Sequence, residues 1–296
     1  MQKQNAGDEH LCVVTVTTDS FIAGTLVTLG SFLKNNSWFA GEIVIVCNEL
    51  SEQNREHLKL VCDKIIFLKV SDELLTRIAQ ITEAFPDFVP KQANYYSLET
   101  FRLRGYKRAL FLDSDLLFRG SIRDLFKLEN EFIACGDGAF YNSRGRRWGS
   151  GIEDETDIRV LYNTFNSGLF LVDDSLLTDE TYNGLVKLVD KRIYKTPNMS
   201  LTDQVILNLY FAGRQHLVSG KYNCLLAHRH SIFERENIGF RDAVVLHFNG
   251  KQKPWTTGTI LNHSLRDAVS IKAYELWFES YTECLRKLQT SQNRLL

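Results

Sequence analysis

The segment Ala109-Leu-Phe-Leu-Asp113-Ser-Asp115-Leu-Leu117 says most about the fold of this 296-residue chain. Within the strand predicted over 108–112, the run from Ala109 to Leu112 is continuously apolar, as in a parallel strand buried on both faces. The run ends in two carboxylates two positions apart, and extended backbone places side chains at i and i+2 on one face. Carboxylates that close repel unless a cation lies between them, which suits Mg²⁺ or Mn²⁺ held against phosphate oxygens. An acidic strand-to-loop turn would give the same pattern, so this segment alone leaves both interpretations open.

Short β-branched runs alternate with helical patterns around this segment. Strands are predicted over 11–17, 42–47, 64–70, 108–112, 131–135, 167–172 and 243–246, and helices over 20–35, 51–61, 94–104, 178–192, 201–211 and 270–288. Strand-helix-strand order implies parallel strands joined by right-handed crossovers. We therefore predict an α/β fold with a mostly parallel sheet flanked by helices, as a single domain with a C-terminal helical appendage. Ligands of such sheets bind beyond the carboxyl ends of the strands.

Composition excludes several classes of protein. The formal net charge is −1, so no overall basic field would attract nucleic acid. The six cysteines are scattered without a CxxC pair, which is typical of a reduced, cytosolic chain. No apolar run is long enough for a membrane-spanning helix, and the N-terminal residues have no apolar signal core. We expect a cytoplasmic protein that binds no nucleic acid.

A second segment carries residue types suited to metal and phosphate binding: Leu246-His247-Phe-Asn-Gly250-Lys-Gln-Lys253-Pro-Trp255. A neutral imidazole is a good Mn²⁺ ligand beside carboxylates, and glycine allows the backbone to approach a ligand closely. Lys253 offers a point charge for a phosphate. A hydrogen-bonded core histidine and a packed Trp255 in a solvated loop are the alternative interpretation.

Two further segments are weak alone. Asn166, in Phe165-Asn166-Ser167-Gly168, is explained equally well by a turn. Asp203, in Leu201-Thr-Asp203-Gln204, is explained equally well by helix capping. The loop predicted over 142–157 contains Arg144, Arg146, Arg147 and Trp148, and is interpreted either as a lid or anionic-acceptor contact or as a solvated loop.

Together these segments resemble glycosyltransferase family eight, the group of glycogenin and the bacterial lipopolysaccharide glucosyl- and galactosyltransferases. The matching pieces are residues 14–18 with 24–33, 106–115, 165–170, 202–208 and 247–255. The resemblance implies a GT-A (Rossmann-like) fold, a UDP-sugar donor, retention of anomeric configuration, and Mn²⁺ with Mg²⁺ as the alternative. It also implies a nucleotide-sugar-binding catalytic domain over 1–258, followed by the helical appendage over 259–296.

The resemblance also assigns roles to residues. Asp113, Asp115 and His247 match the metal ligands, and Gly250 and Lys253 match the loop that closes over the diphosphate. Asn166 matches the residue near the donor sugar, and Asp203 and Gln204 match the pair beneath the anomeric carbon. Thr17, Thr18, Asp19 and Phe21 occupy the uridine segment, and Ser114 lies within the acidic motif. Ser97 stands where the family often has lysine; either Arg102 or Lys91 compensates, or the diphosphate and sugar contacts differ.

The predicted activity is retaining transfer of a hexose to a glycan, a lipid-linked acceptor or another hydroxyl acceptor. Asp203 is the better candidate for a carboxylate nucleophile, because Gln204 could only stabilise charge or accept weakly. A phosphohydrolase of the haloacid dehalogenase type is one alternative, although Leu117 stands where that family has threonine. A nucleotidyltransferase and a non-catalytic nucleotide-sugar-binding protein are the others. The enzyme would be cytoplasmic, either free or touching the inner face of a membrane through its C-terminal helix.

Overall fold

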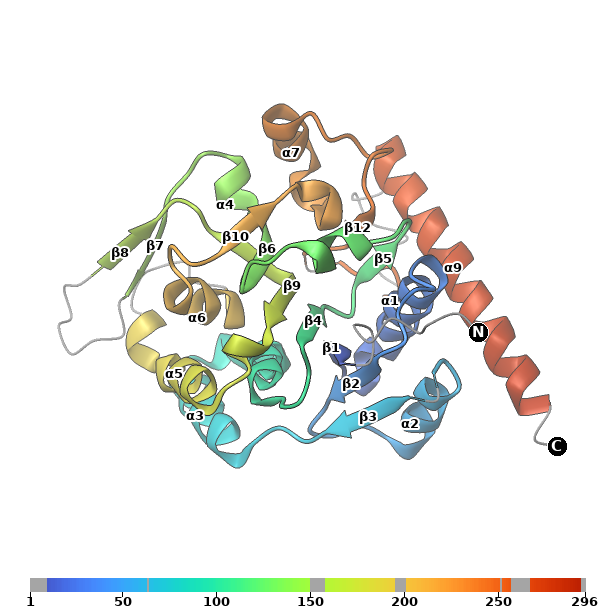
Figure 1. The fold of residues 1–296 in the computed structure, drawn as a ribbon, viewed down its shortest axis with the longest axis horizontal. Coiled ribbons are helices and arrows are strands. Elements are labelled where there is room, and N and C mark those ends of the chain that lie inside the picture. Colours follow the sequence, from blue (N-terminus) through green and yellow to red (C-terminus); the bar gives the residue numbers. More distant parts are fainter. Residues whose placement is uncertain are drawn as a thin grey trace.

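A central sheet covered by helices on both faces forms the body of the molecule (Figure 1). The computed structural model describes residues 10–62, 64–149, 158–194, 201–250, 252–256 and 267–293. Within these residues the sheet has seven strands in the order β10-β6-β9-β4-β1-β2-β3. The strands are β1 (Leu11–Val16), β2 (Glu42–Val46), β3 (Ile65–Leu68), β4 (Arg108–Leu112), β6 (Phe132–Gly136), β9 (Phe165–Asp173) and β10 (His216–Val218). Only β9 among them runs antiparallel to its neighbours, so the predicted mostly parallel α/β sheet is confirmed.

Alternating side chains along each strand bury both faces of the sheet, as a period of two requires. On one face Val14, Phe111 and Phe170 pack in one cluster; on the other Val13 and Leu110 pack in a second. The first cluster includes residues from α3 (Asp72–Ala84), η2 (Pro86–Arg102), α5 (Asp179–Leu188) and α6 (Asp203–Tyr210). The second includes residues from α1 (Ile22–Asn35) and α2 (Glu52–Lys59). Because helices cover both faces of this sheet, its strands are apolar at successive positions rather than at alternate ones.

A three-stranded sheet lies beside the carboxyl end of β4. It contains β5 (Leu116–Phe118), β11 (Cys224–Leu225) and β12 (Val245–His247) in the order β11-β12-β5. In the β12–β5 register, His247 pairs with Leu116. This register places His247 next to the acidic motif, although 131 positions of sequence separate Leu116 from His247.

One sequence prediction of local structure is confirmed with a different extent, and another is wrong. The segment predicted as helical over 94–104 belongs to a longer 3₁₀ helix, η2, whose residues from Tyr95 to Phe101 are all buried. Burial on every side leaves no amphipathic pattern from which to judge helix type. The loop predicted over 142–157 contains β7 (Arg146–Gly149), which pairs with β8 (Ile158–Leu161), and Trp148 is buried in the core rather than solvated. Residues 150–157 lie outside the described part.

The sequence analysis predicted one of the outer helices and missed others. The predicted C-terminal helix is α9 (Ala268–Asn293), which runs along the outside of α1 and buries Trp277 (Figure 1). By contrast, α3, α4 (Gly138–Tyr141) and α7 (Arg229–Glu236) had no predicted counterpart. The predicted boundary at 258/259 falls outside the described residues, so that division stays a prediction.

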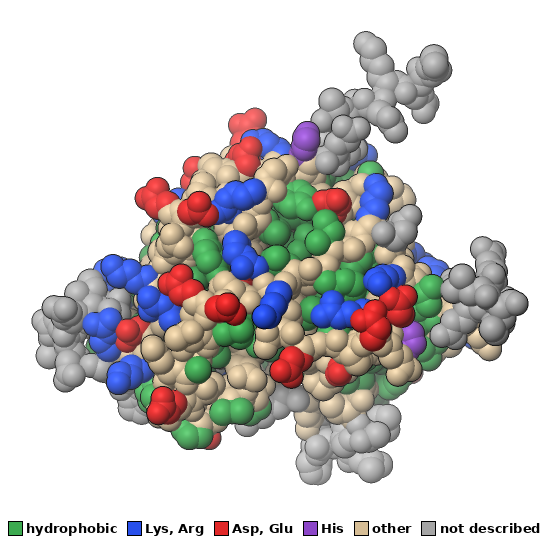
Figure 2. Space-filling view, turned by 90° about the horizontal axis from the view of Figure 1, so that it is seen from below, with side chains coloured by type: hydrophobic (Ala, Val, Ile, Leu, Met, Phe, Trp, Pro, Cys, Tyr) green, Lys and Arg blue, Asp and Glu red, His purple; other side chains and the backbone are tan. Residues whose placement is uncertain are grey.

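The described helices include none with the length and apolar character that a membrane span requires. On the face seen in Figure 2, Lys and Arg side chains are interspersed with Asp and Glu side chains, in keeping with the net charge of −1.

Candidate active site

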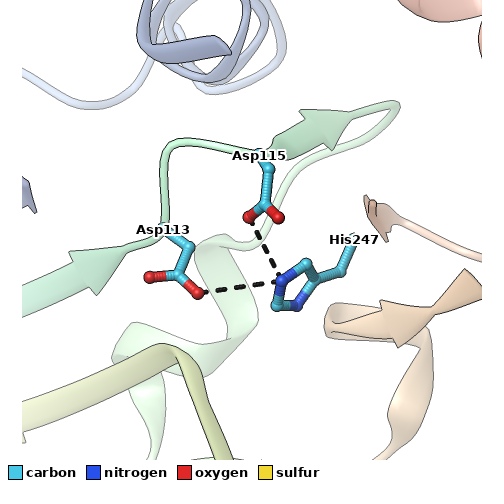
Figure 3. A group of neighbouring side chains, drawn as sticks. All are labelled: Asp113, Asp115 and His247. Carbon is cyan, nitrogen blue, oxygen red and sulfur yellow. Dashed lines mark ion pairs between the residues drawn. The ribbon is translucent and has the colours of Figure 1, made fainter. Parts of the chain in front are cut away.

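Asp113, Asp115 and His247 converge at the carboxyl end of β4 and point toward one another (Figure 3). The Nε2 atom of His247 lies 3.1 Å from Asp115 Oδ1 and 3.7 Å from Asp113 Oδ2. One ligand atom from each residue lies within 4.8 Å of the others. Asp115 and His247 are buried, whereas the Asp113 side chain is 40% exposed, so the group opens to solvent on one side.

Gly168 makes this convergence possible. The backbone N–H of Asp113 donates to the carbonyl of Gly168 at 2.8 Å, which fixes the end of β4 against β9. A Cβ atom on Gly168 would lie 2.4 Å from His247 Cε1 and 2.7 Å from Asp113 Oδ2. Such contacts are far inside van der Waals distance, so the cluster requires a residue without a side chain at position 168.

The donor set fits a hard divalent cation. Two carboxylates and one imidazole are ligands that Mn²⁺ accepts readily, and carboxylates suit Mg²⁺ as well. The partial burial of its carboxylate, reinforced by the charge of Asp115, raises the pKa of Asp113 to about 7. Burial also opposes ionisation of Asp115, but Lys253 and His247 outweigh it and hold the pKa of Asp115 below its ordinary value. Bringing a second carboxylate to this point therefore costs free energy that a bound cation would recover.

Lys253 is the cation that this chain itself supplies. Its Nζ contacts Asp115 Oδ2 and donates to the carbonyl of Phe248 at 3.0 Å. It lies on the loop after β12, where Gly250 has φ of +112°, a conformation that favours glycine. The next aromatic residue, Trp255, donates from Nε1 to the carbonyl of Ser20 at 3.1 Å and so links this loop to the predicted uridine segment.

The residues predicted near the donor sugar lie beside the metal group. Asn166 Nδ2 donates to Gln204 Oε1 at 3.0 Å. Ser97 donates to Asp203 Oδ2 at 2.8 Å, so the residue at the family's lysine position holds the carboxylate instead. Burial raises the pKa of Asp203. Of the two cations suggested as compensation, Arg102 pairs with buried Glu99 at 2.7 Å.

The predicted uridine segment follows β1, the strand next to β4. Several of its side chains serve the fold: Thr17 lies 2.7 Å from Thr25, which donates to Ser114 at 2.9 Å. Asp19 accepts from Ser51 and Asn54, and the side-chain hydrogen bond from Asn54 is the largest cause of its lowered pKa. Thr18 lies 3.0 Å from the Ser20 hydroxyl, Oγ to Oγ. The ring of Phe21, which is 37% exposed, meets Trp255 edge-on at 5.4 Å, leaving an aromatic pair at this end of the site.

Comparison with known families identifies the chain. A family model described as glycosyl transferase family 8 matches residues 12–259. The chain belongs to this family. The match covers most of the chain and contains every predicted site residue. Membership makes the protein a glycosyltransferase enzyme and favours this activity over the phosphohydrolase alternative.

Individual members of the family share about a quarter of the sequence. Mouse glycogenin-1 is 27% identical over 283 residues, covering 91% of this chain and 74% of that protein. For human glycogenin-1 the identity is 28%, over 82% of this chain and 61% of that protein. A lipopolysaccharide 1,2-glucosyltransferase of Escherichia coli is 25% identical over 257 residues, covering 80% of this chain and 70% of that protein.

Solved structures confirm the GT-A-like fold. Galactosyltransferase LgtC, crystallised with donor and acceptor sugar analogues, superposes with a TM-score of 0.66 at 19% identity, covering 92% of this chain and 95% of that one. The glycosyltransferase GlyE of Streptococcus pneumoniae TIGR4 superposes with a TM-score of 0.61 at 19% identity, covering 96% of this chain and 64% of that one. At this level of identity the likeness concerns the fold alone.

Two site residues of this family member, Asp137 and Asn223, escaped the sequence analysis. Asp137 follows β6 just as Asp113 follows β4, so an acid at the carboxyl end of a strand was a usable signal. Its carboxylate accepts from Gln204 Nε2 at 3.0 Å and from Arg146 Nε at 2.5 Å. Asn223 lies 2.8 Å from His247 Nδ1, but its position between two short elements gave no pattern to read.

Proposed function

We propose that this glycosyltransferase moves a hexose from a UDP-sugar to a hydroxyl of a glycan or lipid-linked acceptor, with Mn²⁺ and with retention of anomeric configuration. The observation that carries the proposal is the meeting of Asp113, Asp115 and His247 beside Lys253. A metal held here lies at the carboxyl edge of the sheet, where ligands of α/β sheets bind. The adjacent aromatic pair, Phe21 and Trp255, offers apolar surface for a nucleobase.

Charge neutralisation is the chemical task of this cluster. Cleavage of the sugar–phosphate bond develops negative charge on a UDP leaving group. A divalent ion bound by Asp113, Asp115 and His247 would act as a Lewis acid toward the diphosphate. Lys253, released from Asp115, would add a fixed positive charge to the same diphosphate. The carbonyl of Phe248, 3.0 Å from Nζ, keeps this ammonium at the loop while its ionic partner changes.

Retention requires the acceptor hydroxyl to arrive on the face that the leaving group vacates, or a covalent intermediate to form. Asp203 is the carboxylate candidate for the second route, and hydroxyls of Ser97 and Thr202 hold it at 2.8 and 3.1 Å. Gln204 presents a carbonyl oxygen that would stabilise positive charge on the sugar, the need of the first route. The roles of both residues stay predictions.

A donor screen tests the proposal. The purified enzyme is incubated with Mn²⁺ and UDP-glucose, UDP-galactose or UDP-N-acetylhexosamines, and UDP release is followed with and without EDTA; a GDP-sugar is the matched control. We expect slow UDP release from one donor even without acceptor, lost on chelation and absent for the control. Release of inorganic phosphate from a simple phosphomonoester would instead support the phosphohydrolase. Tight UDP-sugar binding without release would support a non-catalytic binder.

We further propose that the enzyme is cytoplasmic and that any membrane contact is peripheral, through α9. The basic side chains Arg286 and Lys287 are exposed on this helix. Glu283 lies 3.7 Å from Lys287 and also pairs with Lys34, so opposite charges share this surface. Sedimentation with vesicles that contain anionic lipid, compared with neutral vesicles, tests the contact.

A further inference from the structure

A chain of side-chain amides, buried except for the partly exposed Asn166, connects the metal group to Asp137. His247 Nδ1 lies 2.8 Å from Asn223 Oδ1, and Asn223 Nδ2 donates to Asn166 Oδ1 at 2.9 Å. Asn166 Nδ2 donates to Gln204 Oε1 at 3.0 Å, and Gln204 Nε2 donates to Asp137 Oδ2 at 3.0 Å. The Asn223 side chain is fully buried, and Gln204 and Asp137 are nearly so.

The Asp137 end fixes the direction of donation. Its carboxylate accepts from the backbone N–H groups of Ala139 and Phe140, both at 2.9 Å, from Thr164 at 2.7 Å and from Arg146. An ionised carboxylate only accepts, so Gln204 must turn its NH₂ group toward Asp137. The carbonyl oxygen of Gln204 then faces Asn166, which must donate to it.

An independent anchor gives the same direction. The backbone N–H of Gly168, which can only donate, lies 3.0 Å from Asn166 Oδ1. This oxygen therefore faces Gly168 and Asn223, and the NH₂ group of Asn166 faces Gln204, as the first anchor requires. Asn223 in turn must donate to Asn166, so its carbonyl oxygen faces His247. The two anchors agree on every amide in the chain.

We propose that Asn223 is a positioning residue that favours the His247 proton on Nδ1, so that Nε2 is the nitrogen available to a cation held between Asp113 and Asp115. A ligating imidazole needs one bare nitrogen, and the hydrogen bond at the other nitrogen decides which one. Asp137, paired with Arg146, sets the direction of donation along this chain of amides, which we call the amide relay. The role in metal binding rests on the proposed function, whereas the tautomer does not. The amide relay thus orients both the histidine ligand and the carbonyl of Gln204.

Metal affinity provides the first test. Mn²⁺ binding is measured from the EPR signal of free Mn²⁺ in the wild type, Asn223→Leu, Asn223→Asp and Asn36→Leu. Loss of a hydrogen-bonding partner of a ligand weakens binding by about 10–100-fold, which we expect for Asn223→Leu. Asn223→Asp keeps an acceptor for the Nδ1 proton and should restore most of the affinity. Asn36, equally buried and hydrogen-bonded but at the far end of α1, controls for general destabilisation.

The tautomer provides the second test, without metal. Ring ¹⁵N chemical shifts of His247 are recorded in metal-free protein, at a pH high enough to leave the ring neutral. In metal-free protein Asp115 Oδ1, 3.1 Å from Nε2, competes with Asn223 for the ring proton. We therefore expect a larger share of rings protonated on Nδ1 in the wild type and in Asn223→Asp than in Asn223→Leu. Equal shares in the wild type and Asn223→Leu, or Mn²⁺ affinity unchanged in Asn223→Leu, would overturn the inference. Wild-type protein with an Nδ1 proton but without Mn²⁺ affinity would refute the metal site while supporting the tautomer.

Discussion

The acidic side chains at the two ends of β4 differ in how they are paired with cations. At the amino end, Lys107 lies 3.0 Å from Asp174 and Arg108 lies 3.6 Å from Asp173, so acids meet cations supplied by this chain. At the carboxyl end, the ion pairs among the described residues are that of Lys253 with Asp115 and those of the His247 imidazole with Asp113 and Asp115.

The ion pairs at the amino end of β4 are complete within the chain, whereas the carboxylates at the carboxyl end are suited to binding a ligand. Lys107 and Asp174 are exposed, and such ion pairs contribute little because water and salt screen them. Asp115 is buried, and Asp113 keeps a pKa raised to about 7 because its surroundings disfavour its charge. Among the described residues, the carboxyl end thus compensates Asp113 incompletely, and the family's nucleotide-sugar chemistry explains why a chain would fold with that deficit.

Removing the buried acid should produce the largest effect. Asp115→Ala deletes a ligand atom and leaves Lys253 without its carboxylate, so transfer should fall by at least about 10²–10³-fold and metal-dependent UDP binding should be lost. UDP release and calorimetric UDP titration with Mn²⁺ measure both. Asp174→Ala, at the amino end of β4, is the matched control and should keep wild-type turnover. Unchanged turnover in Asp115→Ala would remove the metal hypothesis.

The substitution Gly168→Ala should produce the second-largest effect. In Gly168→Ala the new Cβ would press on His247 and Asp113, and His247 is too buried to move away freely. We expect Mn²⁺ affinity to fall by about 10–100-fold with the far-ultraviolet circular dichroism unchanged. Gly120→Ala is the control, because its nearest neighbour, Val244 Cγ1, would lie at an ordinary 3.5 Å. Equal affinities in the two variants would show that the three side chains do not act together.

Lys253→Ala should move two affinities in opposite directions. Without its ammonium, Asp115 is free for a metal, so Mn²⁺ alone should bind several-fold more tightly. UDP-sugar should bind about 10–100-fold more weakly, because a hydrogen bond from a charged donor contributes about 1.5–3 kcal/mol. Separate titrations of metal and donor give the two signs, and Lys253→Arg should retain much of the donor affinity. A loss of both affinities would mean that Lys253 merely holds the loop.

Local pattern was enough to predict the carboxyl end of β4. A continuous apolar run followed by two acids is visible in nine residues, and the His247 segment carries its own glycine and lysine. Their meeting was predicted through family resemblance rather than from geometry, because it depends on the β12–β5 register between distant segments.

Other parts of the site depend on packing that the sequence does not reveal. Asn223 acts through a contact across 24 positions of sequence, and asparagine in a turn has many uses. Trp148 was assigned to a predicted loop, because the charged residues around it give no sign that β7 pairs with β8. Asp137 repeats the strand-then-acid pattern of Asp113, so this residue could have been found.

The amino end of β4 should give the smallest effect. Lys107→Ala removes an exposed ammonium from Asp174 and from Asp173, at 3.0 and 3.6 Å. Because exposed pairs are screened, the melting temperature should shift by less than about 2 °C, and UDP release should equal that of the wild type. Differential scanning calorimetry and the donor assay measure these quantities. A large loss of activity here would contradict the comparison, because charge at the two ends of β4 would then act on the same chemistry.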